Sequence, residues 1–417
     1  MNKKTIVNIV KRIAKFPVRV IREPFLDIRA SYYLKKQGPK KCSGSGKIKV
    51  GFIVQMPELW DKQSSVYTKM VNDPDFDVYM IIVPAFDFVK SCVGDYSGEK
   101  HFFITACLNG NYILVKTESQ IVNLENEHFD YLFYQRPYDH YLPSSLRSST
   151  TVKFTKVCYI PYATPEIKKT NIYPRSFFRN LSFGFMEDQG SAQVNTERML
   201  HNCQKGLQKF LNIGYPTFEK CLKRNKECNY LCFLWTPRWS YDPIAGGSHF
   251  MEYNQFLTNY NWETCSLTVR PHPMMWENFI KTGLVNEADI AVIKEQWALN
   301  NIEIDKNNSI EDTFDETDVM ISDKSSVIPM FFLTGKPVIY CPVDCEYGSL
   351  FSTILPGLYI ANNWEELKSF IQMLSKQEDP LLQTRKKIIA EYFSYNDSAT
   401  EKIVDEIKND FYISSKK

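Results

Sequence analysis

The order of β-rich and helical segments is the feature that most constrains how this chain can fold. From Ile48 onward, short runs of β-branched and aromatic residues alternate with longer runs of helical periodicity. This alternation is typical of parallel sheets, in which a helix connects each strand to the next. The expected strands are IKVGFIVQ, DVYMIIVP, YLFYQ and VCYIPY in the first half, and YLCFLWTP, SLTVRPHP, DVMIS and PVIYC in the second. We therefore predict an α/β protein with two Rossmann-like domains whose parallel sheets face a cleft.

Length and composition agree with two globular domains. At 417 residues the chain is too long for one compact core. A formal net charge of +2 argues against nucleic-acid binding, which normally needs a strongly basic domain. No apolar run reaches the ~18 residues of a membrane-spanning helix. We predict a basic segment and linker at residues 1–47, a first Rossmann-like domain at 48–200 and a second at 201–417.

Positive charge is concentrated at the start of the chain. Residues 1–41 contain twelve Lys and Arg but only two acidic residues. Apolar side chains recur at Ile6, Ile9, Val10 and Ile13, which is the spacing of one helical face. We interpret this segment as an amphipathic helix that lies on anionic lipid at the membrane surface. The alternative is a helix that packs on its own protein and keeps its basic side in water.

Polar residues directly follow four of the predicted strands. They form clusters at residues 135–136, 236–240, 270–272 and 322–326. The carboxyl ends of parallel strands meet at one edge of a sheet, and ligands of such sheets bind there. We therefore expect the functional site to be built from these clusters.

The segment SDKSSVIPMFF predicts a phosphate-binding turn. Ser322 and Asp323 end a strand, and Ser325 and Ser326 fall in the first turn of the following helix. Free N–H groups and the positive end of the helix dipole attract phosphate at that position. The alternative is ordinary N-capping by the same side chains.

Two neighbouring strand ends supply further candidates for binding phosphate. Arg238 follows the strand FLWTP and is predicted to clamp a phosphate. His272 stands between two prolines and could donate to a phosphate oxygen or shuttle a proton, although a single histidine is more often structural. Arg270 could hold a second phosphate oxygen or pair with a carboxylate. His249 is a weaker candidate because we expect it to begin a helix.

Strand ends in the first half supply candidates for the opposite side of the cleft. The candidates from this half are Gln135, Arg136, Asp139, His140, Tyr159 and Tyr162.

No His, Cys, Asp and Glu cluster has convincing metal-ligand spacing, so we predict neither a metal nor a cofactor. Arginine, histidine and the helix dipole would then balance the phosphate charge.

Four motifs, in this order, resemble those of the CDP-glycerol glycerophosphotransferases of bacterial teichoic acid and capsule synthesis. NIGYPTFEKCL is similar to the Gly-Tyr-Pro segment that opens the family's second domain, and FLWTPRWS to its aPTfR strand end. VRPHP is similar to the family's KpHP, and DVMISDKSSVIPMFFLTGKPVIYC to its DvlItDYSSvxfDfllldkPiify. The resemblance covers about residues 214–345 and extends more loosely back to Ile48.

The resemblance implies a GT-B fold and transfer of glycerol phosphate, or a related polyol phosphate, from a CDP donor with release of CMP. The acceptor would be a hydroxyl of a lipid-linked molecule or polysaccharide, and the enzyme would be peripheral at the cytoplasmic face of the cell membrane. The first domain would bind the acceptor and the second the donor. By the same resemblance, His272 and the turn of Ser325 and Ser326 would hold the donor pyrophosphate, with Arg238 nearby.

One family feature is missing from this sequence. The family's WHGtplK motif carries a histidine that is proposed as the general base, and CYIPYATPEIK stands here instead. Tyr162, Asp139 and His140 are therefore the candidates for the base. Two alternatives also stay open: a GT-B glycosyltransferase that uses a nucleotide sugar, and a non-catalytic membrane-associated module that binds a nucleotide.

Overall fold

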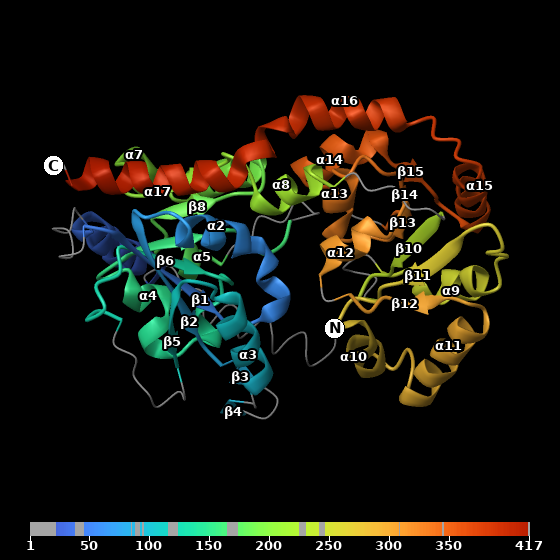
Figure 1. Cartoon of the computed structure of the whole chain (residues 1–417), viewed down its shortest axis with the longest axis horizontal. Coiled ribbons are helices and arrows are strands. Elements are labelled where there is room, and N and C mark those ends of the chain that lie inside the picture. Colours follow the sequence, from blue (N-terminus) through green and yellow to red (C-terminus); the bar gives the residue numbers. More distant parts are fainter. Residues whose placement is uncertain are drawn as a thin grey trace, which may run out of the picture. The chain divides into compact units, whose positions relative to one another are not determined.

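The computed structural model describes residues 22–37, 46–84, 86–87, 92–93, 96–115, 124–164, 174–224, 231–241, 247–307, 309–343 and 346–415. The chain divides into two compact units, which are described separately (Figure 1). Unit 1 comprises Met1–Tyr162, Tyr173–Asn212 and Glu401–Lys417, and unit 2 comprises Ala163–Ile172 and Ile213–Thr400. The end of the chain thus returns to the unit in which the chain begins.

Unit 1 is built on a seven-stranded parallel sheet with the order β5-β2-β1-β6-β7-β8-β9. Six of the seven residues of β1 are buried, as expected for a parallel strand covered on both faces. Phe52 of β1 stacks on Phe133 of β6, with ring centroids 4.9 Å apart. The strands are β1 (Ile48–Val54), β2 (Phe76–Ile82), β5 (Asn111–Leu114), β6 (Tyr131–Tyr134), β7 (Lys156–Tyr159), β8 (Phe183–Phe185) and β9 (Lys209–Leu211), with a separate antiparallel pair β3 (Phe86–Asp87) and β4 (Cys92–Val93).

The last helix, α17 (Ala399–Ser415), is anchored to the sheet of unit 1. Asp410 accepts hydrogen bonds from the Tyr131 hydroxyl (2.6 Å) and from Lys156 Nζ (2.5 Å). Helix α17 is therefore part of this unit's structure. The other helices of unit 1 are residues 22–36, α2 (Asp61–Val71), α3 (Ser97–Ala106), α4 (Ser148–Thr151), α5 (Arg175–Phe178), α6 (Gln189–Arg198) and α7 (Leu200–Gln204).

Unit 2 contains a six-stranded parallel sheet with the order β12-β11-β10-β13-β14-β15. Its strands are β10 (Cys232–Thr236), β11 (Ser266–Val269), β12 (Glu303–Ile304), β13 (Val319–Ser322), β14 (Val338–Tyr340) and β15 (Tyr359–Ile360). Its helices are α8 (Pro216–Leu222), α9 (Phe250–Thr258), α10 (Met275–Lys281), α11 (Glu287–Leu299), α12 (Ile310–Asp315), α13 (Val327–Phe332), α14 (Ser349–Ile354), α15 (Trp364–Ser375) and α16 (Leu382–Tyr392).

The prediction of two parallel α/β sheets is confirmed. All eight predicted strands occur, as β1, β2, β6, β7, β10, β11, β13 and β14. The predicted amphipathic segment around Ile6–Ile13 lies outside the described residues. Among the helices that the structure describes, none combines the length and apolar character needed to cross a membrane.

Candidate functional site

Ser322 lies inside the sheet of unit 2. It ends β13, is fully buried, and its Oγ lies 2.7 Å from Thr236 Oγ1, at the end of the neighbouring strand β10. The Ser322 hydroxyl also lies 3.2 Å from the Thr236 carbonyl oxygen. These bonds join two adjacent strand ends, so the Ser322 side chain supports the site from within the sheet.

Asp323 fastens the surrounding loops to the end of β13. Its Oδ2 accepts hydrogen bonds from the Ser248 hydroxyl (2.8 Å) and from the backbone N–H groups of Arg238 and His249 (both 3.3 Å). Burial raises the pKa of Asp323, although His249 and these donors oppose the shift. A carboxylate can only accept such bonds and repels phosphate, so this geometry favours a positioning role for Asp323.

The turn before α13 carries the two serines of the predicted phosphate site. Ser326 is the N-cap residue, yet its side chain makes no capping bond. The Ser325 hydroxyl is 3.5 Å from the Val327 N–H, which is a weak capping contact at most. Both serines are partly exposed, so their hydroxyls are available to a ligand, whereas the Ile328 N–H of the first turn already donates to the Ser325 carbonyl (3.2 Å). Arg238 lies against the same turn, where its Nη1 donates to the Lys324 carbonyl (3.3 Å).

His272 lies at the surface just after β11. Its Nδ1 accepts a hydrogen bond from the Met274 N–H (3.2 Å), so the neutral ring carries its proton on Nε2. Nearby protein atoms that exclude water, and then the charge of Arg238, together lower the pKa of His272 to about 4. The ring nevertheless remains exposed. At neutral pH His272 can thus donate one hydrogen bond to an anion without carrying a charge.

The charge of Arg238 makes a specific prediction for His272. Replacing Arg238 with methionine removes a positive charge near the imidazole, so the pKa of His272 should rise toward its ordinary value. NMR titration of the histidine ring protons measures this shift, and Arg224→Met is the matched control because Arg224 pairs with Asp315 elsewhere in unit 2. An unchanged or lower pKa in the Arg238 variant would contradict the assignment.

Arg270 pairs with a carboxylate, which is one of the two roles that the sequence allowed for it. Its guanidinium pairs with Asp305 and donates to the Asn307 carbonyl (2.9 Å) and the Thr313 hydroxyl (3.0 Å). Burial alone would raise the pKa of Asp305, but bonds from Thr313 and Arg270 together lower it. Arg270 therefore stabilises the loop after β12. His249, the weaker candidate, lies at the start of α9, where its ring forms a hydrogen bond with the Pro342 carbonyl (2.8 Å).

In unit 1, Gln135 and Arg136 join the ends of β6 and β1. Gln135 Oε1 accepts from the N–H groups of Gln55 (2.9 Å) and Met56 (2.8 Å). Arg136 donates to Gln55 Oε1 (2.8 Å), and its guanidinium lies 4.5 Å from the centroid of the Tyr141 ring. These contacts fix the loop after β6. Gln55 was missed as a contributor, although its place at the end of the predicted strand IKVGFIVQ was a usable signal.

The candidate general bases differ in how they are held. The Tyr162 hydroxyl lies 3.0 Å from that of Tyr138, and burial followed by this hydrogen bond raises the pKa of Tyr162. Asp139 accepts from the Ser148 N–H (2.8 Å) and hydroxyl (2.7 Å), and burial raises its pKa despite these bonds. His140 is exposed. Tyr159 is buried, and its hydroxyl accepts a long bond from the Tyr162 N–H (3.4 Å).

Tyr162 is expected to be dispensable as a base. Because its phenol stays protonated at neutral pH, Tyr162→Phe should keep CMP release from a CDP-polyol within about threefold of the wild type, whereas loss of a general base typically costs 10²–10⁴-fold. Tyr138→Phe removes the other half of the same hydroxyl pair and is the matched control. A hundredfold loss confined to the Tyr162 variant would restore it as the base.

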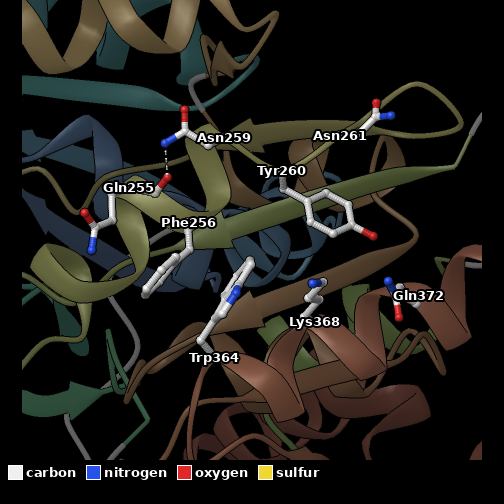
Figure 2. A pocket seen from close by; sticks show the side chains of 8 residues that line it. All are labelled: Gln255, Phe256, Asn259, Tyr260, Asn261, Trp364, Lys368 and Gln372. Carbon is white, nitrogen blue, oxygen red and sulfur yellow. Dashed lines mark hydrogen bonds between the residues drawn. The ribbon is translucent and has the colours of Figure 1, made fainter.

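A separate hollow of about 640 Å³ lies between α9 and α15 in unit 2 (Figure 2). Phe256 and Trp364 stack there with ring centroids 4.9 Å apart, and Lys368 lies one turn further along α15. Helix α9 spans about 13 Å, with this hollow near its last turn and Ser248 just before its first. The hollow is thus distinct from the residues around Asp323.

Among the described residues, no cluster of His, Cys, Asp and Glu could hold a metal ion.

Comparison with protein families identifies the region that contains the donor-side candidates. Residues 234–409 match the family model of CDP-glycerol:poly(glycerophosphate) glycerophosphotransferases. This part of the chain is similar to that family over somewhat less than half of the 417 residues. The match confirms the resemblance seen in the motifs and supports a transferase. None of the curated proteins compared with the sequence matches it.

Solved structures establish the fold of the whole glycerophosphotransferase-like chain. The wall teichoic acid polymerase TagF is 13% identical with a TM-score of 0.54, over 97% of this chain and 98% of that one. UDP-GlcNAc 2-epimerase from Neisseria meningitidis, bound to UDP-GlcNAc, is 12% identical with a TM-score of 0.55, over 87% and 100%. At this identity the likeness shows the fold alone, and it confirms the GT-B type.

Proposed function

We propose that this protein transfers glycerol phosphate, or a related polyol phosphate, from a CDP-activated donor to a hydroxyl of a lipid-linked or polysaccharide acceptor in the synthesis of teichoic acid or capsule polymer. The observation that carries the proposal is the family match over residues 234–409. That stretch contains Arg238, His272 and the turn of Ser325 and Ser326. TagF, a wall teichoic acid polymerase by name, shares the fold over nearly its whole length.

In the proposed reaction the acceptor hydroxyl oxygen attacks the β-phosphorus of the CDP-polyol. A new P–O bond replaces the bond to the bridging oxygen, CMP leaves with that bond's electron pair, and the hydroxyl proton passes to a base. The protein's main contribution is to position the groups and to stabilise charge. His272 Nε2–H, Arg238 and the first turn of α13 would bind the phosphates, and no metal or cofactor is proposed.

The acceptor would bind to unit 1, with Gln135, Arg136 and Tyr159 shaping the strand ends. His140 is the base candidate that the geometry favours most, since its ring is exposed. Asp139 has both oxygens engaged by Ser148 and would need to break those bonds to accept a proton. The missing family histidine would then be replaced by a residue from another loop.

The helix of residues 22–36 supports a peripheral location at a membrane surface, which we propose to be the cytoplasmic face. Phe25, Ile28 and Tyr32 lie on one face of it and are 64%, 69% and 53% exposed. An exposed apolar stripe with basic neighbours is typical of helices that lie in a membrane interface. Exposed basic residues of the same helix are Arg22, Arg29, Lys35 and Lys36.

The proposal is tested by CMP release from CDP-glycerol and CDP-ribitol, with the purified full chain and lipid-linked acceptor. Release that depends on acceptor supports a polyol phosphate transferase and identifies the polyol. Release of a nucleoside diphosphate from a nucleotide sugar would instead establish a glycosyltransferase. Binding of CMP without any turnover would point to a non-catalytic module.

A further inference from the structure

A cavity of about 630 Å³ in unit 1 is lined by the helix of residues 22–36, the loop after β6, and residues around α5. This volume falls in the ~300–1,000 Å³ range of small-molecule pockets. Four arginines line it, whereas Asp139 is the one carboxylate among its described lining residues. The cavity is therefore strongly biased toward a negatively charged ligand.

One of the four arginines is neutralised by the helix itself. Arg179 is 4% exposed and pairs with Glu23 and with Asp27 (3.2 Å). Arg175, outside the cavity lining, pairs with the second oxygen of Asp27 (2.8 Å). These ion pairs hold the helix of residues 22–36 against the rest of unit 1. They also engage both acidic side chains of that helix.

The other three arginines, Arg22, Arg29 and Arg147, keep their charge for a ligand. Across the part of the chain that the structure describes, no carboxylate forms an ion pair with any of them. Arg147 donates through Nε to the Leu142 carbonyl (3.1 Å), which holds its guanidinium in place at the cavity. Asp139, which feels the charge of Arg147, has both oxygens bound by Ser148.

We propose that this cavity binds the phosphate or diphosphate of an anionic lipid headgroup. Planar guanidinium groups match the geometry of phosphate oxygens and bind them through paired hydrogen bonds. Arg22 and Arg29 belong to the helix whose outer face exposes Phe25 and Ile28, so the cavity lies beside the apolar stripe that we assign to the membrane. Resting on the proposed function, the headgroup would be that of the lipid-linked acceptor, held next to His140.

The test compares two double variants that lose the same charge. Arg29→Gln with Arg147→Gln removes cavity arginines, and Lys35→Gln with Lys36→Gln removes exposed charges of the same helix outside the cavity. Isothermal titration with inorganic pyrophosphate, with Arg238→Met present in every protein to weaken the proposed donor site, should show affinity about tenfold or more weaker in the first variant and unchanged in the second. Flotation with phosphatidylcholine vesicles, with and without phosphatidylglycerol, should show a larger loss of anionic-vesicle binding in the first variant.

Each result decides part of the proposal. Equal behaviour of the two double variants in both arms overturns the cavity site. Loss of pyrophosphate binding with normal vesicle binding overturns the lipid source and leaves a soluble phosphate ester as the ligand. Arg29→Gln alone, at an exposed position, repeats the test if the double variant fails to fold. Since neither arm requires turnover, a failed CMP-release assay would refute the transferase and leave the cavity result standing.

Discussion

Replacing His272 with alanine should lower the proposed CMP release from the CDP-polyol by about 100-fold or more, the cost expected for a lost donor to transition-state charge. The chain should still fold, because the ring is exposed and, within the part of the chain that the structure describes, its hydrogen bond is a local one from the Met274 N–H. Steady-state CMP release with saturating acceptor measures the effect. Turnover within about threefold of the wild type would remove His272 from the site.

The choice of replacement separates two roles for His272. Glutamine places an N–H donor near the position of Nε2, so His272→Gln should recover part of the lost activity if the imidazole only donates a hydrogen bond. His272→Gln should equal His272→Ala if the ring must shuttle a proton. Asparagine, whose amide reaches only as far as Nδ1, is the matched control and should not rescue.

The pH profile gives a second readout of the same group. With a pKa lowered to about 4, His272 in the free enzyme is neutral from pH 6 to pH 8 and becomes protonated only in acid. The pH dependence of kcat/KM should therefore contain no step near pH 6.5 that is caused by His272. The result that would contradict this is a step near pH 6.5 that is present in the wild type and absent from His272→Gln. Such a step would mean that water reaches the ring more freely than its surroundings indicate.

Most of the buried strands were predictable, whereas the edge strands were missed and so was the short interior strand β8, which is buried at all three positions. Strands such as β1 and β13 are almost entirely buried, and their apolar runs mark them clearly. The missed strand β5 has two exposed residues, and the missed strands β12 and β15 have two residues each. Such short segments form strands because a neighbouring strand pairs with them, and the local sequence does not indicate the presence of that neighbouring strand.

The site was predictable as a set of loops but not atom by atom. Strand-end position brought Arg238 and Asp323 to one turn, as the parallel topology requires. Strand-end position does not show that the Ser322 hydroxyl faces Thr236 or that Arg270 pairs with Asp305. The partners in these two contacts are about 86 and about 35 positions apart in the sequence, beyond the range of local patterns. The arginine cavity likewise joins segments that are far apart in the sequence.

Loss of Arg385 is expected to cause the largest change in stability. Its side chain is fully buried, pairs with Asp379 and donates through Nε to the Gly335 carbonyl just after α13 (3.1 Å). Asp379 is also bound by the Tyr359 hydroxyl (2.6 Å), so Arg385→Met leaves a carboxylate without its cation. Breaking a buried ion pair from one side typically costs about 3–5 kcal/mol, and because the Asp379 side chain is partly exposed we expect a loss at the lower end of that range.

Chemical denaturation of the full chain measures this loss, with Lys386→Met as the control on the exposed side of the same helix. If α16 holds α13 in place through Arg385, weaker CMP binding should accompany the loss of stability, because the predicted phosphate turn begins α13. A variant that binds CMP normally while its free energy of unfolding falls would show that the turn is held by Asp323 and Arg238 alone. Equal stability of the Arg385 and Lys386 variants would contradict the ion pair itself.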